Sequence, residues 1–122
     1  MGLRLQLGLW YPRKASELVV RAGSELGALD IFVSDVGRHH QMESILDMTT
    51  ELFDWTMKTN LYAPFCIIRA ALPHFKPGST IIDTTSEQAY DPANFYDCAQ
   101  TKAATMDCVK SLGKQFGPRA SE

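Results

Sequence analysis

Two side chains near the carboxyl end of the sequence have the chemistry for proton transfer. Cys98 and Lys102 are four residues apart, and residues at this spacing share one face of a helix, so an ammonium group can lie beside a thiol. A free thiol ionises near pH 8.5, and a neighbouring positive charge favours the thiolate. We therefore expect Cys98 to be partly ionised at neutral pH if Lys102 lies beside it.

Two histidines offer a second kind of chemistry. His39 and His40 follow a predicted strand and could approach Ser86 or Cys98 in space. A histidine base beside a serine or cysteine nucleophile can hydrolyse an ester or a lactone. Both histidines could equally be solvated loop residues, since no third group that would orient them can be named. No metal site is expected, because adjacent histidines rarely face one ligand.

The elements that must position these residues alternate between helix and strand. The apolar periodicity predicts strands over 29–33 and 79–85 and helices over 15–26, 50–75 and about 97–116. The alternating leucines of residues 3–9 favour a further strand, and Pro64 should bend the long middle helix. This alternation predicts a parallel sheet covered by helices on both faces. Gly37 and Ser86 would then lie side by side beyond the carboxyl ends of two strands.

Length and composition limit the class of protein. The 122 residues carry a formal charge of −2, with 45% hydrophobic and 21% charged residues, so we expect one folded domain over residues 1–122. No basic run could follow a nucleic acid backbone, and no apolar stretch is long enough to span a membrane. Three cysteines match no zinc motif and favour free thiols. These features predict a cytoplasmic protein without nucleic acid or membrane partners.

Several ordered segments resemble the short-chain dehydrogenase/reductase superfamily. Residues 26–37 resemble that superfamily's LGxLDILVNNAG segment, with both asparagines and the alanine replaced. Residues 58–61 resemble its helix with the catalytic asparagine, and residues 82–86 resemble its strand that ends in the catalytic serine. Residues 98–104 fall where the superfamily has YxxxKAA, so that Cys98 stands in the tyrosine position. The similarity extends over residues 18–118.

This resemblance implies a reduced three-layer Rossmann-like sandwich and NAD(P)-dependent oxidation or reduction of an alcohol or carbonyl group. Ser86 would hold the substrate oxygen, Lys102 would bind the nicotinamide ribose, and Asn60 would anchor a water relay. Gly37 would lie beside the cofactor, and Cys98 would replace the proton donor. Because cysteine is shorter than tyrosine by about one aromatic ring, we expect impaired catalysis. Tyr90 and Tyr96 are possible substitutes for the missing tyrosine.

Alternatives to these roles remain open at the level of sequence. Asn60 could satisfy backbone groups inside the helix bend, and Lys102 could be an ordinary solvated lysine. The glycine-rich turn that binds a pyrophosphate is absent from the sequence, and by resemblance it would precede residue 1, so we expect weak dinucleotide binding or none. Resemblance also implies a homo-oligomer through helices 50–75 and 98–116. The hypotheses are thus an oxidoreductase for a small-molecule substrate, a hydrolase, and a non-catalytic oligomerising fragment.

Overall fold

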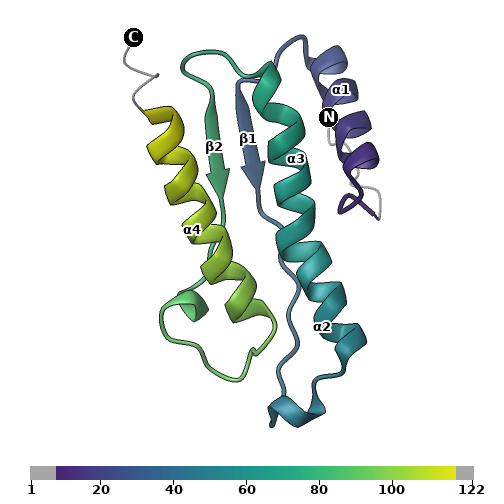
Figure 1. Cartoon of the computed structure of the whole chain (residues 1–122), viewed down its shortest axis with the longest axis vertical. Helices are drawn as coiled ribbons and strands as arrows, with labels where there is room; N and C mark the ends of the chain where they lie inside the picture. The colour runs from purple at the N-terminus through teal and green to yellow at the C-terminus, as the bar shows by residue number, and fades with distance from the viewer. Residues whose placement is uncertain (1–7, 118–122) are drawn as a thin grey trace.

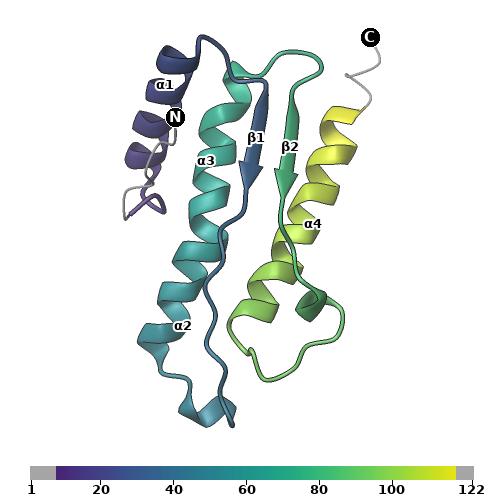
Figure 2. The ribbon, with the colours of Figure 1, turned by 180° about the vertical axis from the view of Figure 1, so that it is seen from behind.

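A computed structural model of the chain describes residues 8–117, which form four α-helices and two strands in an elongated arrangement (Figures 1 and 2). In chain order these are α1 (Pro12–Leu26), β1 (Ile31–Ser34), α2 (Thr50–Met57), α3 (Ala63–Ala71), β2 (Thr80–Asp83) and α4 (Cys98–Phe116). Short 3₁₀ helices occur at Ile45–Asp47, Leu72–His74 and Glu87–Ala89. Most of the strand predicted over residues 3–9 lies outside the described residues, and Gly8 and Leu9 belong to a turn.

The helix ends follow local sequence signals. Helix α1 begins at Pro12, whose missing N–H is not needed in a first turn, and ends at Gly27 in the left-handed region with φ of +82°. Helix α2 is capped by Thr49, whose hydroxyl accepts a hydrogen bond from the Leu52 amide at 3.2 Å. These boundaries confirm the predicted starts and stops within one turn.

The long middle helix is interrupted where the sequence predicted a bend. A π-helical turn over Lys58–Tyr62 joins α2 to α3, and the Ala63 amide donates to the Lys58 carbonyl, five residues earlier. Pro64 follows this turn at the start of α3. Because proline has no N–H to donate to the carbonyl four residues earlier, the regular ladder cannot continue through it. The single predicted helix therefore forms as two α-helical segments with a wider turn between them.

The two strands form a parallel sheet. Ile31 pairs with Thr80, and Ser34 pairs with Asp83. The Thr84 amide extends the ladder by donating to the Ser34 carbonyl at 2.9 Å. Gly37 and Ser86 each follow the last paired residue of their strand by three positions. The sheet thus brings these two loops to the same edge, as the sequence predicted.

The helices lie on one face of the sheet (Figures 1 and 2). The core forms mainly between α1 and α3, and its buried members are Leu9, Ala15, Val19, Ala63, Ile67 and Ala71. On the opposite face of the sheet, Ile31, Val33 and Ile82 are 65%, 58% and 51% exposed. The predicted α/β class with a short parallel sheet is confirmed. Coverage of both faces, however, is not found within residues 8–117, where one helix layer packs on one sheet layer.

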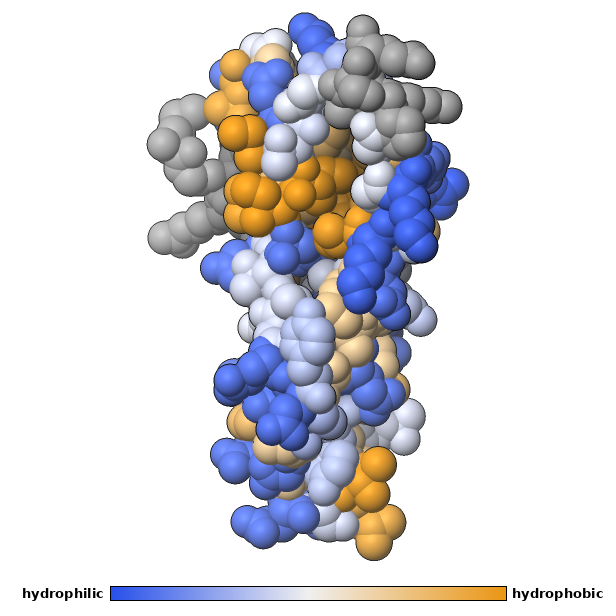
Figure 3. Space-filling model, turned by 90° about the vertical axis from the view of Figure 1, so that its left-hand side faces the viewer, coloured by the Kyte–Doolittle hydropathy of each residue, from blue (hydrophilic) through white to orange (hydrophobic). Residues whose placement is uncertain are grey.

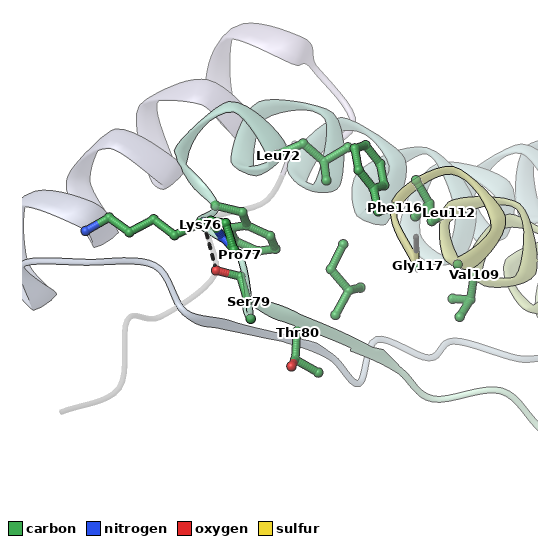
Figure 4. A pocket seen from close by; sticks show the side chains of 13 residues that line it. Leu72, Lys76, Pro77, Ser79, Thr80, Val109, Leu112, Phe116 and Gly117 are labelled. Carbon is green, nitrogen blue, oxygen red and sulfur yellow. Dashed lines mark hydrogen bonds between the residues drawn. The ribbon is translucent and has the colours of Figure 1, made fainter. Parts of the chain in front are cut away.

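An apolar groove of about 530 Å³ opens beside β2 at the end opposite to the Ser86 loop. Apolar side chains gather on this side of the molecule (Figure 3). Leu72, Val109, Leu112 and Phe116 line the groove, and the Lys76 side chain points away from them (Figure 4). The groove therefore offers apolar contact without a charged group directed into it.

Candidate functional site

The Lys102 ammonium group joins the carboxyl ends of the two strands. Lys102 lies on α4 and is 5% exposed. Its Nζ atom donates to the Thr84 carbonyl at 2.6 Å and to the Val36 carbonyl at 2.8 Å. An ammonium has three N–H donors, so one is left after these two hydrogen bonds. The alternative of an ordinary solvated lysine is wrong, because a buried lysine persists only where its donors find acceptors.

Asn60 fixes the loop that follows β1. It lies in the π-helical turn and is 1% exposed. Its side-chain oxygen accepts from the Arg38 amide at 2.9 Å, and its nitrogen donates to the Arg38 carbonyl at 2.8 Å. The same nitrogen donates to the Thr101 hydroxyl at 3.1 Å. The partners of Asn60 are therefore a distant loop and α4, rather than backbone groups inside the helix bend.

Ser86 lies at the expected edge of the sheet and begins the 3₁₀ helix at Glu87–Ala89. Its hydroxyl oxygen accepts from the Gln88 amide at 3.2 Å. A hydroxyl that accepts one bond keeps its own hydrogen for donation. Ser86 is partly exposed, so this hydrogen can reach a ligand while the oxygen caps the short helix.

The Cys98 thiol begins α4 and is 8% exposed. Burial raises the pKa of Cys98, and this effect outweighs the nearby Lys102 charge, which acts to lower it. The expectation of a partly ionised thiol at neutral pH is therefore wrong. Desolvation penalises the thiolate more than the lysine stabilises it, and the nearby negative charge of Asp97 acts in the same direction as desolvation.

A buried carboxylate lies directly before Cys98. Asp97 is 0% exposed and accepts from the Thr56 hydroxyl at 2.6 Å and from the Cys98 amide at 2.7 Å. It also accepts from the His40 ring, since Nδ1 lies 3.0 Å from its Oδ2 atom. Burial alone would raise the pKa of Asp97, but the hydrogen bonds from Thr56, His40 and Cys98 together lower it. Asp97 is thus an anion that ties α2, α4 and the loop after β1 together.

The His40 ring is occupied at both nitrogens. The Arg38 Nη2 atom lies 3.1 Å from the His40 Nε2 atom, and a guanidinium group can only donate. Nε2 must therefore accept, which leaves the ring proton on Nδ1 for donation to Asp97. The His39 ring packs edge-on against Phe95 at 5.2 Å. His40 has no nitrogen left to act as a base, so no observation supports the hydrolase alternative.

Asp83 and Ser34 form a polar pair at the last register position of the sheet. Ser34 is 2% exposed and pairs with Asp83 across the two strands. Burial raises the pKa of Asp83, while the nearby Ser34 hydroxyl and the charge of Lys102 act against this shift. The positive charge of Lys102 therefore acts on the Asp83 carboxyl group at the strand ends.

Asp97, Thr56 and Arg38 are site residues that the sequence did not single out. A signal was present for Asp97, because aspartate is a preferred residue at the position before a helix. Thr56 carried no signal, since its partner Asp97 lies 41 residues further along the chain. The roles predicted for Ser86, Cys98, Lys102, Asn60 and Gly37 stay predictions. What the structure adds is that Lys102 contacts both strand ends and Asn60 contacts the loop that follows Gly37.

Comparison with known proteins places this geometry in a family. A family described as enoyl-(acyl carrier protein) reductase matches residues 11–121. General stress protein 39 of Bacillus subtilis is 45% identical over 100 residues, and an uncharacterized oxidoreductase, YghA, of Escherichia coli is 38% identical over 106 residues. A short-chain dehydrogenase from Burkholderia cenocepacia, solved in complex with NADP, matches with a TM-score of 0.86 and 29% identity.

The chain belongs to the short-chain dehydrogenase/reductase superfamily. The matches cover 81% and 86% of this chain for the two bacterial proteins but only 35% and 36% of those proteins. For the Burkholderia structure they cover 95% of this chain and 48% of that one. The chain therefore spans about a third of the length of these curated relatives. None of the helices within residues 8–117 has both the length and the apolar character needed to cross a membrane.

Proposed function

We propose that the chain forms the central part of an NAD(P)-dependent oxidoreductase that acts on a carbonyl or alcohol group. The observation that carries this proposal is the Lys102 ammonium, which is held between the carboxyl ends of two parallel strands. Ligands of open α/β sheets bind at this edge. The family membership and the NADP complex of the Burkholderia protein support the same assignment.

The residues present fit the nicotinamide end of such a cofactor, which would supply or accept a hydride when bound. Lys102 keeps one N–H for a ribose hydroxyl, and Ser86 keeps its hydroxyl hydrogen for a carbonyl oxygen. Gly37 is exposed at the same edge, so it leaves space for a ring. No glycine-rich phosphate-binding turn occurs within residues 8–117. Binding by this chain therefore rests on the nicotinamide end and should be weak.

Cys98 limits the chemistry at the proton-donor position. Its side chain is shorter than that of tyrosine, and it is 8% exposed with a raised pKa. A thiol this short cannot reach a carbonyl oxygen placed for a phenol hydroxyl. We propose that this substitution impairs reduction while leaving the remaining contacts of the site in place.

Cofactor binding can be tested by titrating NADPH into the chain and following the cofactor's fluorescence. We expect weak binding, with a dissociation constant on the order of 1 mM. Lys102→Met should raise this constant about ten-fold, because it removes the ribose contact, and circular dichroism should check that the variant is folded. Lys110→Met is a matched control, since Lys110 is exposed on the same helix. Absence of binding at millimolar NADPH would overturn the cofactor assignment.

The role of position 98 can be tested by comparing Cys98→Tyr with Cys98→Phe. The two variants add rings of nearly equal size, and only the tyrosine adds a hydroxyl. We expect Cys98→Tyr to gain carbonyl reduction with NADPH over the parent chain and Cys98→Phe to gain none. Equal activity in the two variants would show that a proton donor at this position is irrelevant.

We also propose that copies of the chain associate through helices 50–75 and 98–116. Tyr62, at the end of the π-helical turn, and Phe65, on α3, are 52% and 53% exposed, and exposed aromatic rings favour an interface. Light scattering should show a dimer or a higher oligomer, and Phe65→Glu should shift it toward monomer. An unchanged mass for Phe65→Glu would place the contact elsewhere.

A further inference from the structure

We propose that Arg38 binds an anionic group, a carboxylate or a phosphate, of a small ligand at the carboxyl end of β1. This inference goes beyond the oxidoreductase proposal because it requires no dinucleotide. It rests on how the Arg38 guanidinium is held, which donors it leaves unused and which charges surround it.

The backbone of Arg38 is fixed relative to the sheet. Both its amide and its carbonyl are hydrogen bonded to the Asn60 side chain, at 2.9 Å and 2.8 Å. Asn60 is buried and also contacts Thr101 on α4. The backbone from which the Arg38 side chain extends is therefore held in place, and less conformational entropy is lost when this side chain binds a ligand.

The guanidinium group lies over an aromatic ring. Its central carbon lies 3.6 Å from the centroid of the Trp55 ring, within the range of cation–π attraction. Trp55 is 45% exposed, so the pair lies at the surface rather than in the core. The planar guanidinium fork binds carboxylate and phosphate oxygens in pairs.

Most donors of Arg38 have no acceptor. The guanidinium has five N–H groups, and within residues 8–117 its side chain has one hydrogen-bond acceptor, the Nε2 atom of His40. The Nε atom is buried without a partner. No carboxylate in the described part of the chain forms an ion pair with Arg38. A partly buried cation with unused donors favours an anionic ligand, because such a ligand supplies both the charge and the acceptors.

Asp97 and His40 position this group. Asp97 holds the proton of His40 on Nδ1, and Nε2 is thereby left to accept from Arg38. A protonated or inverted imidazole could not accept this bond. The Asp97 carboxylate thus acts on Arg38 through His40. Because the imidazole ring lies between them, the negative charge of Asp97 does not neutralise the guanidinium directly.

The anion site can be tested without any cofactor. In a Trp10→Phe background, Trp55 is the sole tryptophan, and its fluorescence should change on titration with sodium acetate or sodium phosphate at constant ionic strength set by sodium chloride. We expect saturation with a dissociation constant on the order of 1–10 mM. Saturation by acetate alone would indicate a carboxylate ligand, and saturation by phosphate alone would indicate a phosphate ligand.

Substitution of the arginine decides whether it is the binding group. Arg38→Gln should raise the dissociation constant at least ten-fold, and Arg38→Lys should give an intermediate value because it keeps the charge but loses the planar fork. Arg69→Gln is the matched control, since Arg69 is exposed on α3. Lack of saturation by both anions, or equal constants in Arg38→Gln and Arg69→Gln, would overturn the proposal.

The positioning role has a separate readout. In Asp97→Asn the amide can donate to the Nδ1 atom of His40, which moves the ring proton to Nε2 and removes the acceptor for Arg38. We expect nitrogen-15 NMR to show this change of tautomer, with the dissociation constant raised about three-fold. If Asp97→Asn is unfolded, His40→Phe removes the same acceptor directly. A change of tautomer without a change in anion affinity would overturn the role of His40. A failure of NADPH binding would leave both measurements unaffected.

Discussion

The two ends of the sheet are built in opposite ways. At the carboxyl end, buried polar side chains bond to one another and to the backbone, and five of them are 5% exposed or less: Thr56, Asn60, Asp97, Thr101 and Lys102. At the amino end, α4 and β2 border an apolar groove of about 530 Å³. The outer face of the sheet also leaves Ile31 and Val33 exposed.

This contrast shows where polar groups find partners within residues 8–117. Most polar groups at the carboxyl end bond to residues 36–102, with the Ser34 hydroxyl and the Arg38 Nε atom as buried exceptions, so removing one partner leaves others buried and unsatisfied. The apolar surfaces at the other end have no such partners within residues 8–117. Substitutions should therefore lower the free energy of unfolding strongly at the carboxyl end of the sheet and hardly at all on its exposed face.

The largest effect should come from Asp97→Ala. It leaves the Thr56 hydroxyl and the Cys98 amide without an acceptor and removes the N-cap of α4. We expect the free energy of unfolding to fall by about 4 kcal/mol. Urea denaturation followed by circular dichroism measures this change. Asp107→Ala, on the exposed face of α4, is the control and should change the free energy by less than about 0.5 kcal/mol.

Asn60→Ala should have the next largest effect. It leaves the amide and carbonyl of Arg38 unpaired in a partly buried loop. We expect a loss of about 2–3 kcal/mol in the same denaturation experiment. Gln100→Ala removes an exposed side chain that bonds to the Tyr96 carbonyl, and it should cost less than about 1 kcal/mol. Equal losses of unfolding free energy in the two variants would mean that water replaces the hydrogen bonds of Asn60. The carboxyl end of the sheet would then be open to solvent.

The thiol of Cys98 should be unreactive at neutral pH. Burial raises its pKa, so the thiol stays protonated in the folded chain at a pH where an unfolded thiol has begun to ionise. In a Cys66→Ser/Cys108→Ser background, iodoacetamide should modify Cys98 at least ten-fold more slowly in buffer than in urea. Above the unfolded pKa, this group also lowers stability, because the unfolded chain releases its proton first. Equal rates in buffer and urea would contradict the burial of Cys98.

The smallest effect should come from Val33→Thr on the open face of the sheet. Val33 is 58% exposed, so the threonine hydroxyl stays in water, and we expect the free energy of unfolding to change by no more than about 0.5 kcal/mol. Val19→Thr in the core is the comparison, since Val19 is 4% exposed and should lose about 2 kcal/mol. A loss above about 1 kcal/mol for Val33→Thr would show that this face is covered in solution.

Local sequence signals predicted the elements well. Thr49 and Gly27 mark helix ends because capping and left-handed backbone depend on neighbouring residues alone. The position of Gly37 and Ser86 at the same edge of the sheet could be predicted because the two apolar runs form parallel strands. A continuous apolar run such as Ile31–Val33 does not say which elements cover it, and the expected second helix layer is not found within residues 8–117.

The contacts of the site depend on distant residues and could not be predicted in this way. Lys102 bonds to the carbonyls of Val36 and Thr84, which lie 66 and 18 residues away in the chain. The raised pKa of Cys98 depends on burial, whereas the sequence offered only the neighbouring positive charge. His40 was expected to approach a nucleophile in space because it follows a strand end, but its partners are Arg38 and Asp97.

The π-helical turn at Lys58–Tyr62 sets the rotational phase between α2 and α3. A π turn amounts to one residue more than an α-helical turn, so the side chains beyond it are offset by about 100° from a continuous α-helix. Deleting Thr59 would remove that offset. The apolar face of α3 could then meet α1 only if α2 turned as well, carrying Thr56 away from Asp97. A single extra residue thus allows α3 to face the core while α2 faces the polar site.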